Sequence, residues 1–200
     1  MKRLARVMEH TLAYRVWQAP FAERKLAPVL RRGDVRAARR VLDVGCGPGT
    51  NTRHFAHADY LGIDHNPDYI ADAARRHGRR FLVADVTTYT APPDERFDFI
   101  FMNSLLHHIA TPDARRLLAH LRTLLTADGH IHILDLILPP RPSLARALAR
   151  ADRGDFPRPL AAWRELLEEH FEPVIVEPYP LGAAGLTLWE MLYFKGRARC

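Results

Sequence analysis

Three glycines occupy every second position in the stretch V-L-D-V-G-C-G-P-G-T, which spans positions 41–50. Gly45, Gly47 and Gly49 lie directly after a strand-like segment, in what we expect to be a turn. Glycine has no Cβ, so the backbone of such a turn can approach a ligand closely. The dinucleotide pattern G-x-G-x-x-G would place its third glycine at position 50, which is Thr50, and a phosphate-binding loop would continue with G-K-[ST]. The turn therefore predicts a ligand site that matches neither of these two patterns.

The elements that must position this turn alternate between strand and helix over the first two thirds of the chain. An N-terminal helical region over 1–31 is interrupted at Pro20 and Pro28. Because the strands that follow are apolar enough to be covered on both faces, we expect a parallel sheet flanked by helices. Periodicity predicts strands over 40–44, 59–63, 81–86, 97–102 and 130–138, and helices over 50–58, 67–77 and 113–125.

The last third of the chain has a different pattern. Helices are expected over 141–153 and 160–170, and strands over 174–179 and 186–194. Only the Pro/Gly-rich loop P-Y-P-L-G-A-A-G separates the two strands, which favours an antiparallel pair. We therefore predict a single α/β domain: a Rossmann-like, doubly wound, mostly parallel seven-stranded sheet with an antiparallel last strand and helices on both faces.

Motifs in the same order and spacing resemble those of the class I S-adenosylmethionine-dependent methyltransferases. D-V-G-C-G-P-G-T is similar to the first motif of that family, and L-G-I-D ends the second predicted strand. V-A-D-V ends the third strand, F-D-F-I-F-M-N-S-L-L-H-H-I resembles the fourth motif, and L-L-T-A-D-G-H-I-H-I-L-D resembles the motif that follows it. The resemblance covers roughly residues 40–138. It implies methyl transfer from S-adenosyl-L-methionine (SAM), with S-adenosyl-L-homocysteine (SAH) as the product.

The resemblance also assigns roles to residues of the predicted sheet edge. Asp64 matches the acidic residue that accepts hydrogen bonds from the ribose hydroxyls, and Asp85 the residue that meets the adenine amino group. Asp43 matches the carboxylate that orders the glycine turn and faces the methionine amino group. Asp64 and Asp85 also have a structural reading, as ordinary residues of the turns after strands, and Cys46 is expected to be a small filler rather than a reactive thiol. The full set implied for the cofactor is Asp43, Gly45, Cys46, Gly47, Gly49, Asp64, His65, Asp85, Val86 and Asn103.

The acceptor is expected to be a small molecule methylated at oxygen or nitrogen. Enzymes that methylate exocyclic base amines carry Asn or Asp, two prolines and an aromatic residue, where this chain has Asn103-Ser104-Leu105-Leu106. Neither cysteine is placed for methylation of pyrimidine C5. His107 is the candidate base or polar contact to the acceptor, with a purely structural role as the alternative. Tyr14, Trp17, Phe21 and Arg153 are further candidates for the acceptor side, with plain helix packing as the alternative for Tyr14 and Trp17. An insert over 139–158 is expected to form a lid or a wall of the acceptor pocket, with Gly154 as the hinge of a lid.

This interpretation divides the chain into three parts, an N-terminal helical cap (1–38), a cofactor-binding core (39–138) and a substrate-side insert with the antiparallel strand pair (139–200). The net charge of +6 and the pI near 9.7 motivate a second hypothesis, an RNA methyltransferase, although the arginines are scattered and nucleic acid is the less favoured partner. A third hypothesis is a SAM-binding protein without methyl transfer, and a less favoured fourth is an NAD(P) oxidoreductase. His130 and His132 share one strand face without a third ligand at suitable spacing, so no metal is expected. We expect a cytoplasmic protein without a signal peptide or membrane contact, either a monomer or a homodimer.

Overall fold

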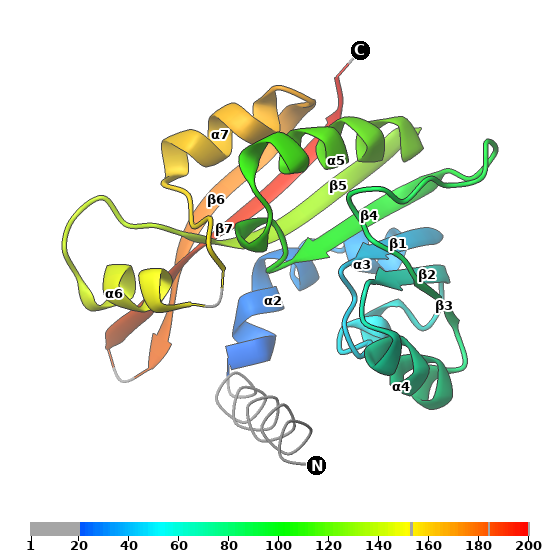
Figure 1. Ribbon diagram of the computed structural model, residues 1–200, viewed down its shortest axis with the longest axis horizontal. Coiled ribbons are helices and arrows are strands. Elements are labelled where there is room, and N and C mark those ends of the chain that lie inside the picture. Colours follow the sequence, from blue (N-terminus) through cyan, green and yellow to red (C-terminus); the bar gives the residue numbers. More distant parts are fainter. Residues whose placement is uncertain (1–20, 153, 184, 200) are drawn as a thin grey trace.

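The computed structural model describes residues 21–152, 154–183 and 185–199. Within these residues seven strands form one sheet, in the order β3-β2-β1-β4-β5-β7-β6 (Figure 1). Neighbouring strands from β3 to β5 are parallel, whereas β7 is antiparallel to both β5 and β6. The predicted fold class is thereby confirmed. The strands are β1 (Arg40–Val44), β2 (Asp59–Asp64), β3 (Arg80–Val83), β4 (Phe97–Asn103), β5 (Leu125–Ile137), β6 (Phe171–Ala183) and β7 (Leu186–Ala198).

Helices cover both faces of the sheet (Figure 1). Helices α5 and α7 lie on one face, and α2, α3 and α4 lie on the other (Figure 1). Helix α6 packs against β7 beside the extended end of the β6–β7 hairpin (Figure 1). The α-helices are α2 (Ala22–Leu30), α3 (Asp34–Ala37), α4 (Pro67–His77), α5 (Thr111–Leu124), α6 (Leu144–Ala151) and α7 (Leu160–Glu168), and the 3₁₀ helices are η2 (Thr52–Phe55) and η3 (Leu106–His108).

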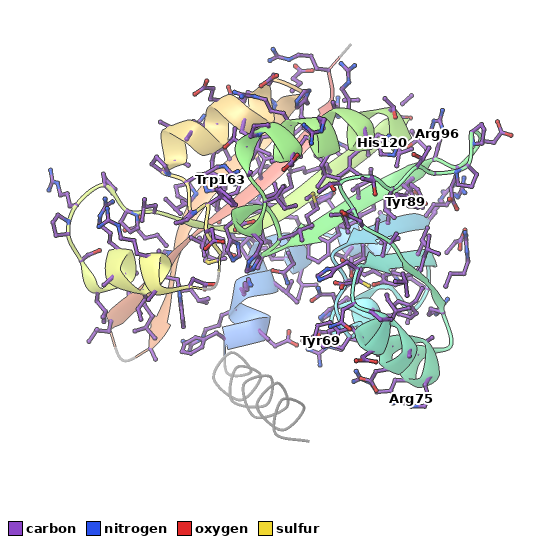
Figure 2. All side chains as sticks on the ribbon, viewed as in Figure 1. Tyr69, Arg75, Tyr89, Arg96, His120 and Trp163 are labelled. Atoms are coloured by element: carbon purple, nitrogen blue, oxygen red, sulfur yellow. The ribbon has the colours of Figure 1, made fainter. Side chains whose placement is uncertain are left out.

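Successive side chains of the central strands point to opposite faces of the sheet, so the core has two layers. In β1, Leu42 and Val44 belong to the cluster beneath α5 and α7, whereas Val41 belongs to the cluster on the opposite face. Trp163 of α7 is fully buried over the sheet (Figure 2) and donates a hydrogen bond from Nε1 to the carbonyl of Leu136 at 2.9 Å. Burial of apolar side chains on both faces fixes the central strands, so their carboxyl ends meet at one rigid edge.

Helix α4 shows how local sequence signals set an element's limits. It spans the predicted residues 67–77: Asn66 caps its N-terminus by accepting from the backbone N–H groups of Asp68 and Tyr69, and Gly78 ends it in the left-handed conformation with φ 59°. Helix α5 begins two residues before the predicted start, and β5 begins directly after it at Leu125. The signals at α4 lie within the helix and its two flanking residues, which is why the sequence alone located both ends.

Several predicted elements were wrong in detail. Strand β3 ends at Val83 rather than at 86, and β5 begins at Leu125 rather than at 130. Residues 50–58 form turns and the short η2 rather than a full helix, because Thr, Asn and His residues compete poorly for helix against turns. Pro28 does not interrupt its helix, since α2 continues to Leu30 and the proline lies in its last turn. The predicted Pro/Gly loop between the last strands belongs to the strands instead: β6 runs through Pro178 and Pro180, which an edge strand tolerates.

Candidate active site

The glycine turn lies directly beyond β1, at the carboxyl edge of the parallel strands. The backbone N–H groups of Gly45 and Cys46 both donate to the carbonyl of Ile63 in β2, at 2.8 and 3.0 Å. Gly45 has φ 73°, and a Cβ there would lie 3.0 Å from the side chain of Leu105. The turn is therefore pressed against the segment that follows β4, and its position relative to β2 is fixed by hydrogen bonds.

Asp64, the last residue of β2, organises the same turn. Its Oδ2 accepts from the backbone N–H of Gly47 at 2.9 Å, and its Oδ1 accepts from the N–H of Asn66 at 2.9 Å. The carboxyl group thus connects the glycine turn to the start of α4. His65 beside it is exposed, with Nδ1 3.5 Å from Asp64 Oδ1. The predicted carboxylate lies beside the predicted glycine turn.

Asp43 is the second carboxyl group at this edge and is only 1% exposed. Tyr60 donates its hydroxyl to Asp43 Oδ2 at 2.7 Å, whereas Asp43 Oδ1 has no hydrogen-bond partner among the described residues. Burial raises the pKa of Asp43 to about 7; the hydrogen bond from Tyr60 opposes this rise, and the negative charge of Asp64 adds to it. An orphaned acceptor with this pKa can bind a cationic group at the turn.

The remaining cofactor candidates lie around these two carboxyl groups. Asp85, beyond β3, is exposed and accepts from the backbone N–H and hydroxyl of Thr87, which lowers the pKa of Asp85. Val86 packs against the core, and the buried Oδ1 of Asn103, at the end of β4, has no partner among the described residues. Burial raises the pKa of the Cys46 thiol, as a filler role requires. Together with Asp64 of β2, these residues mark the carboxyl ends of four adjacent strands.

A pocket of about 440 Å³, part of it open to solvent, lies beside this edge, between α2, the residues after β4 and the β6–β7 hairpin. One end is polar, with Lys25, Ser104, His107 and Asp152. The rest of the wall is apolar and aromatic, which suits an organic ligand. The apolar part is made by Phe21, Ala22, Leu136, Leu181, Trp189 and Met191.

His107 lies between two carboxyl groups in the polar end. Its Nδ1 is 2.6 Å from Asp135 Oδ1, and its Nε2 is 3.6 Å from Asp152 Oδ1. Burial opposes the charged imidazolium, but the negative charges of Asp135 and Asp152 and the hydrogen bond between Nδ1 and Asp135 outweigh burial and raise the pKa of His107 to about 9. Near neutral pH the ring is therefore a cation and a hydrogen-bond donor. Nε2 is buried and makes no hydrogen bond within the described part of the chain.

Lys25 of α2 is the second cation of the pocket. Its Nζ donates to the hydroxyl of Ser104, and the backbone carbonyl of Lys25 accepts from Tyr179 at 2.7 Å. Burial lowers the pKa of Lys25 to about 8, and the negative charges of Asp135 and Asp152 limit the fall. Ser104 has φ 57°, the only positive φ of a non-glycine residue in the described chain. Such a conformation is held by its surroundings and is common at functional sites.

Residues after α6 enclose His107 from the other side. Phe156 donates its backbone N–H to the carbonyl of His107 at 3.0 Å, and a Cβ on Gly154 would lie 2.1 Å from the His107 ring. Arg158 donates to the carbonyls of Leu106 and Ile109, at 2.7 and 2.6 Å. The predicted insert over 139–158 therefore does form a wall of this pocket, and Gly154 serves there as a point of close approach.

Comparisons with known proteins agree with this geometry. Residues 41–129 match the methyltransferase-domain family. The chain is 34% identical over 133 residues to trans-aconitate 2-methyltransferase of Methylobacterium radiotolerans, covering 63% of this chain and 50% of that protein. It is 32% identical over 160 residues to the enzyme of the same name from Shigella dysenteriae, covering 73% and 61%. The chain belongs to the class I S-adenosylmethionine-dependent methyltransferases.

The fold of this class I methyltransferase also matches solved structures. N-methyltransferase NodS from Bradyrhizobium japonicum, in complex with SAH, superposes with a TM-score of 0.72 at 18% identity, over 90% of this chain and 89% of that one. At this identity the likeness concerns the fold alone. The chain spans about half the length of the curated relative from Methylobacterium, so the activity and acceptor of the whole protein are treated below as proposals.

Three residues predicted for the acceptor side fall outside the described residues, and His132, weighed with His130 for metal binding, is buried in the core. Tyr14, Trp17 and Arg153 lie outside the described residues. His132 stacks on Phe99 with 4.0 Å between ring centroids, and its Nδ1 is 3.0 Å from the hydroxyl of Tyr193. Burial lowers the pKa of His132 well below its ordinary value, as expected for a core histidine. Phe21 does line the pocket.

Four polar residues of the site were missed by the sequence interpretation: Lys25, Ser104 and Asp152, which line the pocket, and Asp135, which contacts His107. Asp135 had a signal, because a lone carboxylate interrupts an apolar strand run and such a residue needs a partner when buried. Lys25 and Asp152 had none, since the tertiary fold alone brings α2 and the segment after α6 to His107.

In the described chain no helix has the length and apolarity to span a membrane.

Proposed function

We propose that this methyltransferase transfers the methyl group of SAM to the oxygen or nitrogen of a small-molecule acceptor. The proposal is carried by one observation: the glycine turn with Asp43 and Asp64 lies beside an apolar pocket with a charged end. Methyl transfer is an in-line displacement, so a cofactor site and an acceptor site must adjoin. Family membership supports the same function.

On the cofactor side, residues 39–138 form the binding core. Asp64 accepts hydrogen bonds from the ribose hydroxyls, and the backbone of Gly45, Cys46, Gly47 and Gly49 surrounds the methionine part. Asp43 faces the methionine ammonium group, a role supported by its orphaned Oδ1. The adenine lies beyond β3 and β4, with Asp85 at its amino group and His65, Val86 and Asn103 around it.

On the acceptor side, the N-terminal segment (1–38) and residues 139–200 form the walls. His107 contacts the acceptor as a hydrogen-bond donor rather than as a base, because two carboxylates hold its proton. Tyr14, Trp17 and Arg153 remain candidates for this side. The trans-aconitate of the named relatives is the first acceptor to test.

Calorimetric titration with SAH, with NADH titrated in parallel, tests the cofactor assignment. We expect micromolar binding of SAH and no binding of NADH. Asp64→Ala should weaken SAH binding more than tenfold, because it removes both the ribose acceptor and the hydrogen bond that orients Gly47. Asp59→Ala, at the opposite end of β2, is the matched control and should leave the affinity unchanged. Unchanged affinity in Asp64→Ala would refute the ribose assignment.

A further inference from the structure

Two consecutive histidines and a carboxylate come together at the polar end of the acceptor pocket. A ring nitrogen of His107, a ring nitrogen of His108 and a carboxylate oxygen of Asp152 all lie within 4.8 Å of one another. Within the described residues no other three His, Cys, Asp or Glu side chains are grouped in this way. The histidines belong to η3 and Asp152 directly follows α6, so the fold brings the three side chains together from two separate segments.

The spacing between His107 and Asp152 suits two ligands of one metal ion. His107 Nε2 lies 3.6 Å from Asp152 Oδ1, which is longer than a hydrogen bond. Two ligand atoms that share a tetrahedral Zn²⁺ ion, each about 2.0 to 2.1 Å from it, are separated by roughly 3.3 to 3.6 Å. The His108 ring lies beside the His107 ring, with 4.0 Å between their centroids. A third ligand is therefore within reach of the same position.

The other ring nitrogen of His107 prepares Nε2 for a metal. Nδ1 lies 2.6 Å from Asp135 Oδ1, and Asp135 in turn accepts the backbone N–H groups of Leu106 and Leu136. Metal-ligating histidines commonly donate their far N–H to such a carboxylate, which fixes the ring and leaves the opposite nitrogen for the ion. His107 Nε2 makes no hydrogen bond within the described chain, and the side chain is only 3% exposed. The ring is thus fixed with Nε2 directed at Asp152.

The two cations of this region are directed elsewhere. Arg158 donates to the backbone carbonyls of Leu106 and Ile109, and Lys25 Nζ donates to the hydroxyl of Ser104. No side chain fits between two atoms 3.6 Å apart, so neither cation occupies the position between His107 and Asp152. Their positive charges nevertheless repel a divalent ion. We therefore expect a site of moderate affinity, weaker than a structural zinc site.

We propose that His107, His108 and Asp152 bind a divalent transition-metal ion such as Zn²⁺, with Asp135 as the carboxylate that orients His107. Imidazole and carboxylate ligands together suit Zn²⁺, Co²⁺ or Ni²⁺, whereas Mg²⁺ and Ca²⁺ prefer oxygen ligands alone. Three protein ligands leave a fourth position of a tetrahedral ion open. Because His107 and Asp152 line the acceptor pocket, water or a pocket ligand completes the coordination.

A bound ion changes what the acceptor meets in the pocket. The ion takes the place of the proton on His107 Nε2, so His107 cannot bind the metal and donate from Nε2 at the same time. The next consequence rests on the proposed function: Zn²⁺ inhibits methyl transfer, and a chelator restores it. A rate of methyl transfer that Zn²⁺ does not change would overturn this consequence. The glycine turn supplies none of the three ligands, so SAH affinity should change less than threefold when Zn²⁺ is present.

Calorimetric titration of the chelator-treated full chain with zinc chloride tests the site without SAM or an acceptor. We expect one Zn²⁺ per chain with a Kd on the order of micromolar. His108→Ala, which removes an exposed ligand, and Asp152→Asn should each weaken binding at least tenfold. Asp135→Asn should weaken it about 10- to 100-fold through the orientation of His107. His57→Ala, which removes an exposed histidine after η2, is the matched control and should bind Zn²⁺ as the wild type does.

Two results would overturn the metal site. One is the absence of any binding of Zn²⁺ to the wild type. The other is equal Zn²⁺ affinity in the wild type, His108→Ala and Asp152→Asn, which would place the ion at other histidines of a chain that has eleven. Titration of the same variants with SAH shows that they are folded. Failure of the proposed function would appear as lost SAH binding in the wild type, and the Zn²⁺ titration does not depend on it.

Discussion

Replacing Asp135 by asparagine tests whether His107 is a cation in the folded protein. Asp135 is 0% exposed and accepts three hydrogen bonds, from His107 Nδ1 and from the backbone N–H groups of Leu106 and Leu136. Asparagine has the same shape but only one acceptor oxygen, so one of the two backbone N–H groups loses its acceptor, a cost that does not depend on pH. The negative charge opposite the imidazolium is lost. The variant should therefore be destabilised most where His107 would be protonated in the wild type.

The magnitude follows from the pKa of His107. Its rise from 6.5 to about 9, at about 1.4 kcal/mol for each tenfold change in proton affinity, corresponds to about 3 kcal/mol. Because the folded-state pKa is raised, this stability is fully present below pH 6.5 and is lost as the pH rises through about 9. Because Asp152 supplies part of this rise and remains in the variant, Asp135→Asn should cost up to about 3 kcal/mol more at pH 6.5 than at pH 10. At pH 6.5 this is a fall of about 6 to 12 °C in Tm for a chain of this size.

Urea unfolding of the wild type and the variant at pH 6.5, 8 and 10 measures the effect. Groups that titrate alike in both proteins cancel in the difference between their free energies of unfolding. Lys25 does not cancel, because its pKa of about 8 also depends on the charge of Asp135, and it adds to the effect in the same direction. Asp98→Asn is the control, because Asp98 also accepts backbone N–H groups, from Arg39 and Arg40, but faces no histidine. Its cost should be independent of pH over this range. A loss in Asp135→Asn that is equal at pH 6.5 and pH 10 would refute the charged state of His107.

Two further predictions concern the cofactor turn and the pocket wall. SAH affinity should rise between pH 6 and pH 8, as Asp43 with its pKa of about 7 ionises, and Asp43→Asn should remove this dependence in calorimetry. Gly154→Ala should lower stability by about 1 to 3 kcal/mol, because its Cβ would collide with the His107 ring and carbonyl. In kinetic assays the same variant should raise the acceptor KM and leave the SAH affinity unchanged. An unchanged KM would show that the segment around Gly154 shifts without altering the acceptor site.

The cofactor half was predictable because its signals are local in the sequence. Turn glycines, strand-end carboxylates and the capping of α4 each lie within a few residues of the backbone they shape. The strand order follows from those elements by the rules of parallel sheets. One failure had a tertiary cause: the sequence around Pro178 and Pro180 predicted a loop, but the edge position of β6 removes the penalty for a missing N–H.

The acceptor half was predictable only in outline. Phe21 and the insert over 139–158 were expected at the pocket and lie there. Lys25 could not be assigned, since nothing in its neighbourhood distinguishes a buried pocket lysine from one on a solvated helix face. The role of His107 was also open. Its protonation is decided by Asp135 and Asp152, which follow it by 28 and 45 positions and reach it through the fold.

Residues just beyond β4 connect the two halves of the site. Leu105 packs against Gly45 of the cofactor turn, Ser104 accepts a hydrogen bond from Lys25, and Leu106 donates its backbone N–H to Asp135. Three neighbouring residues therefore contact the cofactor turn, Lys25 of the pocket, and Asp135, whose charge keeps His107 protonated. Ser104 holds the segment in this path by its left-handed backbone conformation, at a cost of about 1 to 3 kcal/mol. Because an in-line displacement tolerates little error in the distance between methyl carbon and nucleophile, we infer that this strained segment sets the spacing between cofactor and acceptor.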